Sequence, residues 1–137
     1  MSVPYVHQLR VRVHEADAQG IVFNANWFMY FDVTMNELLR SLFGNYAALV
    51  EAGADFVVRE ATARFHAPAR FDDDLTIELP IERLGSSSIV VTPRALRDGQ
   101  LLAEGRIIHV CVDPQTLAKR ALPDPVRERL EQWVTGP

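Results

Sequence analysis

The chain has 137 residues, of which 48% are hydrophobic and 23% are charged, a composition typical of one globular domain spanning residues 1–137. The net charge of −4 and the scattering of the 14 Lys and Arg residues argue against electrostatic binding of nucleic acid. The first five residues do not resemble a signal peptide, and no apolar segment is long enough to cross a bilayer. We therefore expect a soluble cytoplasmic protein with neither a nucleic-acid nor a membrane partner.

The first half of the chain predicts a strand, a loop and one unusual helix. Apolar and polar residues alternate from Tyr5 to Val13, which indicates a half-buried strand, and small polar residues from Glu15 to Gly20 end the alternation. From Asn26 to about Phe43, apolar side chains point in nearly every direction around a helical wheel. The polar residues of this segment form one narrow stripe: Asp32, Asn36 and Arg40, with Glu37 beside them. A helix that is apolar almost all round must be buried on most sides, so the rest of the chain should wrap around it.

The second half of the chain predicts the sheet that does so. Four β-rich segments are expected, at residues 56–66, 75–82, 88–96 and 101–112. Pro80 indicates an edge position or a bulge, and turns are expected at residues 85–87 and at Asp98-Gly99. A short amphipathic helix should follow over residues 124–134, with Pro125 at its first position. Short turns imply antiparallel neighbours, so we expect an α+β fold in which a curled antiparallel sheet surrounds one hydrophobic helix.

Several familiar chemistries are absent from the sequence. It has no glycine-rich phosphate loop, no Gly-x-Ser-x-Gly elbow, no His-x-x-x-His pair and only one cysteine. The four histidines are far apart in the chain: His7, His14, His66 and His109. We therefore expect neither a metal site nor a cofactor. Cys111 lies in an apolar strand-like run and is expected to be a buried, inert thiol rather than a nucleophile.

The loop that leads into the long helix is the candidate site. Asp17 precedes an apolar stretch, Gly20 permits a positive φ or close approach of a ligand, and the helix start offers unpaired N–H groups. A carboxylate opposite such donors can attack a carbonyl, or activate water against it, while the donors hold the carbonyl oxygen. The residues alone also fit a simpler interpretation, in which Asp17 is a turn residue and Asn24 or Asn26 caps the helix.

Two segments of the chain resemble a known family. The run from Asp17 to Phe28 resembles the signature of the 4-hydroxybenzoyl-CoA thioesterase family, which includes the YbgC-like acyl-CoA thioesterases: Asp-x-x-Gly-hydrophobic-Val, a polar spacer and an aromatic residue on the first helical turn. The segment from Ala63 to Leu75 resembles the second landmark of the family, a strand that runs through Pro and Arg to an Asp-Leu. The resemblance implies a hotdog fold and the hydrolysis of an acyl- or aroyl-CoA thioester without a cofactor.

The resemblance also assigns roles to individual residues. Asp17 matches the catalytic Asp, which acts as nucleophile or general base, and Gly20 matches the loop glycine. The backbone N–H of Asn24 matches the donor that polarises the thioester carbonyl, and Trp27 matches the aromatic of the first turn. Many bacterial relatives have His at the position of Asn24 and Tyr at that of Trp27, so only the backbone role at Asn24 carries over. A homodimer or homotetramer (a dimer of dimers) is also implied, with its helices side by side and its site at the subunit interface.

Other charged residues have two interpretations each. Arg64 and Arg70 are candidates to bind the phosphates of a CoA-type carrier, or they are solvated charges at the ends of strands. A different hotdog lineage places its catalytic carboxylate on the central helix, where Asp32 and Glu37 lie here. We expect a structural or interface role for both, because Glu37 has Arg40 at i+3 as an ion-pair partner.

Two other functions are compatible with the same fold. A non-catalytic acyl-thioester-binding protein would bind acyl-CoA without releasing thiol. A hydratase or dehydratase, which the resemblance implies would pair a histidine such as His14 with an acid, would form an enoyl product. The released product therefore distinguishes both alternatives from a thioesterase.

Overall fold

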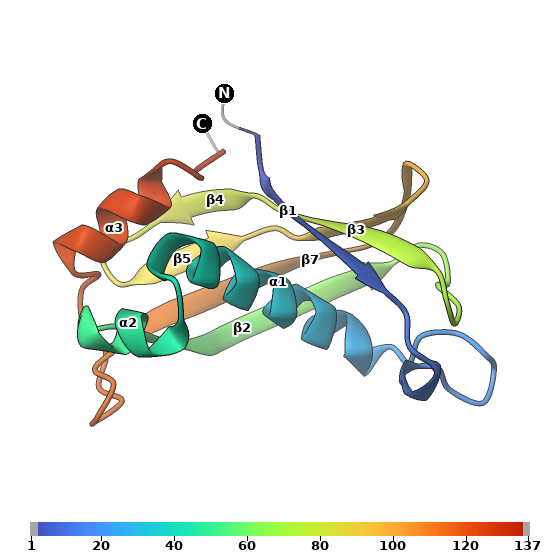
Figure 1. Ribbon diagram of the computed structural model, residues 1–137, viewed down its shortest axis with the longest axis horizontal. Coiled ribbons are helices and arrows are strands. Elements are labelled where there is room, and N and C mark those ends of the chain that lie inside the picture. Colours follow the sequence, from blue (N-terminus) through green and yellow to red (C-terminus); the bar gives the residue numbers. More distant parts are fainter. Residues whose placement is uncertain (1–2, 136–137) are drawn as a thin grey trace.

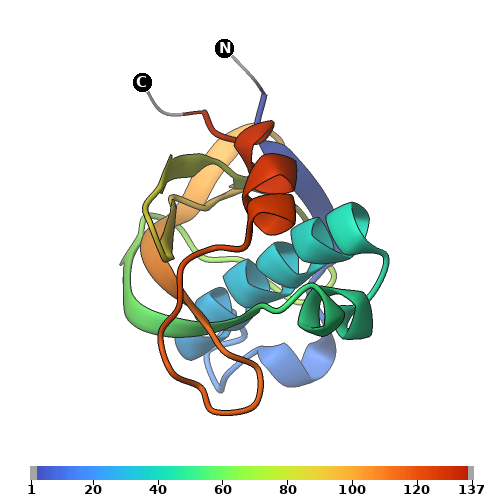
Figure 2. The same cartoon turned by 90° about the vertical axis from the view of Figure 1, so that its left-hand side faces the viewer.

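The computed structural model describes residues 3–135 and consists of a curled antiparallel sheet wrapped around one long helix, α1, which spans Ala25–Phe43 (Figure 1). The strands are β1 (Tyr5–Arg10), β2 (Asp55–Phe65), β3 (Asp74–Leu79), β4 (Ile81–Leu84), β5 (Ser88–Val91), β6 (Arg94–Arg97) and β7 (Gln100–Val112). The other helices are the 3-10 helix η1 (Val13–Glu15), α2 (Tyr46–Glu51) and α3 (Asp124–Glu131). Figure 2 shows the sheet curling around α1, with α2 and α3 at the near end. The predicted α+β architecture is confirmed.

The strand β7 organises the sheet. It pairs with β2 along one side, from Asp55↔Val112 to Phe65↔Ala103, and with β5 and β6 along the other. β3 joins β6 to β1, and every one of these pairings is antiparallel. Because β2 pairs only with β7 among the described strands, its outer edge is open. The end of this strand, at Phe65, lies beside the start of α1.

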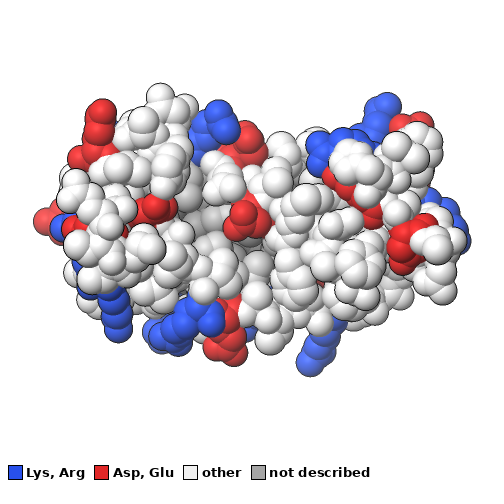
Figure 3. Space-filling view, turned by 90° about the horizontal axis from the view of Figure 1, so that it is seen from below, with Lys and Arg blue, Asp and Glu red and all other residues white. Residues whose placement is uncertain are grey.

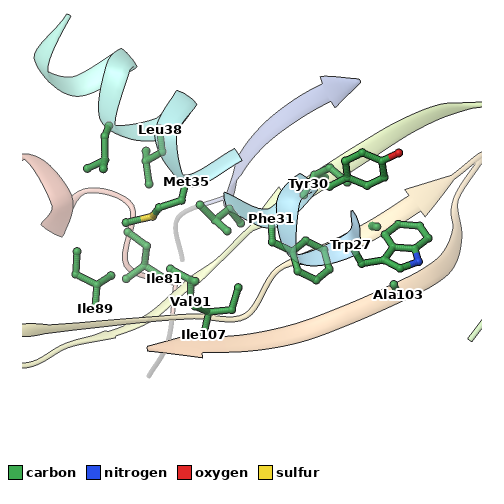
Figure 4. Packing of buried hydrophobic residues seen from close by; sticks show 14 of the residues in the cluster. Trp27, Tyr30, Phe31, Met35, Leu38, Ile81, Ile89, Val91, Ala103 and Ile107 are labelled. Atoms are coloured by element: carbon green, nitrogen blue, oxygen red, sulfur yellow. The ribbon is translucent and has the colours of Figure 1, made fainter. Parts of the chain in front are cut away.

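The core lies between α1 and the concave face of the sheet. The buried residues of α1 include Trp27, Phe31, Met35 and Leu38, which point toward sheet residues that include Ile89 and Ile107 (Figure 4). The helix packs closely here because Gly105 of β7 has no side chain. A Cβ at this position would lie 3.1 Å from the ring of Phe31 and 2.9 Å from the carbonyl oxygen of Thr62.

Several boundaries differ from the prediction for local reasons. The first strand ends at Arg10 instead of Val13, because residues 13–15 form η1. The predicted strand over 88–96 is two strands, since Pro93 has no N–H to donate between them. The short helix α2 was missed, and the side chain of Asn45 caps it by accepting from the N–H of Ala48 at 2.8 Å. The last helix ends at Glu131 instead of 134.

Other local predictions are confirmed. Pro80 separates β3 from β4, and the β4–β5 register shifts between Ile81 and Arg83. Asp98 and Gly99 form the hairpin turn with φ of 50° and 80°. Of the helices within residues 3–135, none combines the length and the apolar character needed to span a membrane.

Candidate active site

The loop between η1 and α1 is closed on itself by backbone hydrogen bonds. Phe23 donates to the carbonyl of Glu15 at 3.0 Å, and Asp17 donates to the carbonyl of Ile21 at 2.8 Å. Gly20 completes the turn by donating to the carbonyl of Asp17 at 2.9 Å with a φ of 78°, which a side chain would strain. The positive φ expected at Gly20 is therefore confirmed.

Asp17 lies at the turn of this loop and is partly exposed. Its Oδ1 accepts a hydrogen bond from the backbone N–H of Gln19 at 2.8 Å, the arrangement of an Asx turn. The predicted turn role is thus confirmed. The other carboxylate oxygen, Oδ2, has no hydrogen-bond partner within residues 3–135, so it is available to a substrate or to water.

A buried carboxylate, Glu15, fixes the loop to the helix. Its side chain is only 2% exposed, and it accepts from the Nε of Arg12 at 2.7 Å and from the hydroxyl of Tyr30 at 2.9 Å. Its backbone carbonyl accepts from the side-chain amide of Asn26 at 2.9 Å. Asp17 follows Glu15 by two residues and Asn24 precedes Asn26 by two, so these bonds set the position of the loop relative to the start of α1.

The electrostatics of Glu15 and Tyr30 follow from this arrangement. Burial opposes ionisation of Glu15, but the hydrogen bonds from Arg12 and Tyr30 outweigh it, so the pKa of Glu15 is lower than usual. Burial raises the pKa of Tyr30, and the neighbouring Glu15 raises it further. Glu15 is thus ionised and Tyr30 neutral at physiological pH, which suits a permanent hydrogen bond rather than proton transfer between them.

The start of α1 is open. Asn24 occupies the N-cap position, as expected, but its side chain makes no capping bond. Asn26 does not cap the helix either, because its amide bonds to Glu15. The backbone N–H groups of Asn24 and Ala25 donate to no other residue in the described part of the chain. Two donors at the positive end of the helix dipole are therefore free to bind an oxygen atom.

A groove of about 320 Å³ lies between the start of α1 and the end of β2. Its lining residues are Ile21, Val22, Asn24, Trp27, Phe65, His66, Ala67 and Pro68. The walls are mainly apolar, while Asn24 and His66 provide polar groups. Asp17 and Gly20 are outside this lining, although both belong to the loop that supplies one wall.

The comparisons with known proteins agree with this geometry. Residues 19–104, more than half of the chain, match the family model of the thioesterase superfamily. This chain belongs to the thioesterase superfamily. The matched segment contains Gly20, Asn24 and Trp27 and begins two residues after Asp17.

Individual relatives of the thioesterase cover nearly all of it. It is 34% identical over 125 residues to the acyl-CoA thioester hydrolase YbgC of Escherichia coli O6:H1, covering 90% of this chain and 93% of the relative. It is 30% identical over 129 residues to the long-chain acyl-CoA thioesterase FadM of Escherichia coli K12, covering 93% and 97%. A solved gentisyl-coenzyme A thioesterase is 30% identical, with a TM-score of 0.81 over 89% of this chain and 98% of that one. The predicted hotdog fold and thioester hydrolase activity are confirmed.

The sequence interpretation overlooked His66 as a residue of the groove. Its ring Nε2 lies 2.7 Å from Oε2 of Glu104 on β7, and both side chains are about two-fifths exposed, at 42% and 40%. The two residues are 38 positions apart in sequence and meet only through the pairing of β2 with β7. The position of His66 in the second family landmark, two residues before Pro68, was the one sequence feature that could have indicated a role in the site.

A second groove of the thioesterase, of about 640 Å³, lies along residues 62–64 of β2, next to β7 and the start of β6. Its lining residues are Thr62, Ala63, Arg64, Thr92, Arg94, Glu104, Gly105 and Arg106. Arg94 pairs with Glu78 at 3.0 Å and Arg106 with Glu82 at 3.3 Å, whereas the side chain of Arg64 has no ion-pair or hydrogen-bond partner within residues 3–135. We call this second groove the arginine groove.

Arg70 is outside the lining of both grooves of the thioesterase. Its backbone forms an isolated β-bridge with Ile21, and its backbone N–H donates a hydrogen bond to Oδ2 of Asp73 at 2.8 Å. Arg64 and Arg70 therefore do not line a common groove. Cys111 is buried, as expected, and burial raises the pKa of its thiol. Within residues 3–135, no three His, Cys, Asp or Glu side chains are grouped to hold a metal ion.

Proposed function

We propose that the thioesterase hydrolyses acyl- or aroyl-CoA at the groove between α1 and β2, with Asp17 as nucleophile or general base. The open start of α1 is the observation that carries the proposal. Asn24 lines an apolar groove, and its backbone N–H has no acceptor in the described part of the chain. The carbonyl oxygen of a thioester is an acceptor that gains negative charge as the reaction proceeds, so a fixed N–H donor stabilises the transition state more than the substrate.

The proposed roles of the other residues follow from their positions. Oδ2 of Asp17 attacks the carbonyl carbon, or removes a proton from a water molecule that does so. Gly20 permits the tight turn that holds this carboxylate, and Trp27 forms a wall of the groove. The CoA phosphates bind in the arginine groove, where Arg64 has no other partner. Arg70 shares no groove with Arg64, which favours the solvated-charge interpretation for Arg70.

We propose that the site is completed by a second copy of the chain, in a homodimer or a dimer of dimers. The open edge of β2 exposes Val57, Val58 and Phe65, at 41%, 52% and 52% of their surface. Phe65 also lines the groove, so the groove reaches the exposed strand. Figure 3 shows the face seen from below in Figure 1, where Lys and Arg lie toward the margins and the middle is mostly uncharged apart from a few acidic groups. An exposed apolar edge strand presents unpaired N–H and C=O groups to which another chain can add.

Replacement of Asp17 by Asn tests the proposed chemistry. Asn keeps the side-chain oxygen that accepts from Gln19 but can neither attack nor take a proton, so the fold should persist. We expect thiol release from acyl-CoA to fall by about 10²–10⁴-fold with little change in melting temperature. Asp98→Asn, at an exposed hairpin turn, is the matched control. Full turnover in the Asp17 variant would refute the proposal.

A further inference from the structure

The two grooves of the thioesterase meet at one pair of side chains. Residues 62–64 of β2 line the arginine groove, and residues 65–68 line the apolar groove at the start of α1. His66 belongs to the apolar groove and Glu104 to the arginine groove, and their side chains are 2.7 Å apart. An acyl chain suits the apolar groove and a phosphorylated carrier suits the basic one. The atom that joins acyl group to carrier is sulfur, so the sulfur should lie beside this pair.

His66 is fixed in a manner that suits proton transfer. Its backbone N–H and that of Ala67 both donate to the carbonyl of Leu102, at 2.7 Å and 3.1 Å, which anchors this end of β2 to β7. The carboxylate of Glu104 holds one ring nitrogen, Nε2, and so orients the ring. The other nitrogen, Nδ1, has no partner within residues 3–135. His66 is also the one titratable side chain in the lining of the apolar groove.

We infer that His66 is a second catalytic residue, which protonates the departing thiolate, and that Glu104 positions it. The inference rests on the proposed function, in which Asp17 activates the attacking water. The water oxygen bonds to the carbonyl carbon while its proton passes to Asp17. The carbon–sulfur bond then breaks with its electron pair on sulfur. The imidazolium form of His66 gives its Nδ1 proton to that sulfur and keeps the Nε2 proton that faces Glu104. Solvent returns the proton from Asp17 to His66, which leaves one acid and one thiol as products.

The acidity of the leaving thiol provides the test. An alkyl thiolate such as that of CoA leaves slowly without a proton, whereas an aromatic thiolate is a better leaving group because its thiol has a lower pKa. We expect His66→Gln to lower kcat on an acyl-CoA by about 10–100-fold, and on the aromatic thioester of the same acyl group by less than about threefold. Glu104→Gln should lower kcat on acyl-CoA by a smaller factor with the same selectivity, because the ring remains but its orientation is lost.

Controls separate this inference from the proposed function and from a structural effect. His7→Gln, on β1 at the other end of the sheet order, should leave both rates unchanged. Asp17→Asn should lower the rate of hydrolysis of both thioesters to the same extent. Full activity of that variant would refute the proposed function and not the role of His66. Melting temperatures verify folding, and His66→Asn is the second variant if His66→Gln unfolds. Equal losses of His66→Gln on the two thioesters, or no loss on acyl-CoA, would overturn the inference.

Discussion

The hydroxyl of Tyr30 donates a hydrogen bond to the buried carboxylate of Glu15 at 2.9 Å, which ties α1 to the loop that carries Asp17. Glu15→Gln would remove the charge that Arg12 pairs with, and we expect it to lower the free energy of unfolding by about 2–3 kcal/mol. Tyr30→Phe would remove one of the donors to Glu15 and should cost about 1–2 kcal/mol. Urea denaturation at neutral pH measures both values.

A double-mutant cycle shows whether the two side chains act through each other. The combined variant should lose less than the sum of the single losses, because the same hydrogen bond is removed in each. Tyr46→Phe is the matched control, since the hydroxyl of Tyr46 donates to Asp55 at the surface and its loss should cost less than about 0.5 kcal/mol. Additive losses at Glu15 and Tyr30 would show that the bond contributes little.

The sequence predicted the long helix and its enclosing sheet because hydrophobic periodicity directly reports burial. It could not predict the buried position of Glu15, because the residue belongs to a polar segment in which an exposed side chain is expected. Its burial depends on Arg12 and on Tyr30, which is 15 residues further along the chain. His66 was overlooked for the same reason, since Glu104 reaches it only through the register of β2 against β7. Periodicity identifies faces of elements, whereas polar contacts between distant segments require the topology.

The stability of the thioesterase should depend on pH through His109. This residue of β7 is 4% exposed on the concave face, and its Nε2 has no partner within residues 3–135. Burial lowers its pKa from 6.5 to about 4, although the negative charge of Asp32 opposes that shift. Between these two values the unfolded chain binds a proton that the folded chain does not, so stability falls as the pH drops from 6.5 toward 4. The expected loss between pH 7 and pH 5 is about 2 kcal/mol.

Replacement of His109 isolates this contribution. His109→Val should lose about 2 kcal/mol less than the parent protein between pH 7 and pH 5 in urea denaturation. Cys111→Val is the control, because it alters a buried residue on the same face of β7 whose raised thiol pKa keeps it protonated over this range. An unchanged pH dependence in the His109 variant would mean that the buried imidazole is not the group responsible.

The arginine groove predicts a substrate-dependent effect on KM. Arg64→Gln should raise the KM for an acyl-CoA by about three- to tenfold, because a charge-assisted contact to phosphate is lost. The same acyl group on pantetheine, which has no phosphate, should show no change. Arg59→Gln removes an equal charge at the β2 irregularity, outside both grooves, and should leave both KM values unaltered. A rise in KM for both substrates would show that Arg64 does not act by binding the phosphates.

The polar stripe of α1 predicts how two copies associate. Asp32, Asn36 and Arg40 are exposed and spaced four residues apart, with opposite charges on either side of Asn36. A two-fold axis near Asn36 would place antiparallel helices so that Asp32 of one subunit meets Arg40 of the other. Asp32→Arg or Arg40→Asp alone should therefore raise the dimer dissociation constant by about tenfold or more, because each creates two like-charge contacts per dimer. The double variant restores opposite charges and should associate nearly as the parent does.

Sedimentation velocity across a concentration series measures this directly. Glu128→Arg, a charge reversal on the exposed face of α3, is the control and should leave association unchanged. The single charge reversals should also lower thioesterase activity at dilute enzyme, because the proposed site needs both copies, and activity should recover as the enzyme is concentrated. If the single variants associate like the parent, the stripe lies outside the interface. If the parent is a monomer yet fully active, the groove of one chain is sufficient for catalysis.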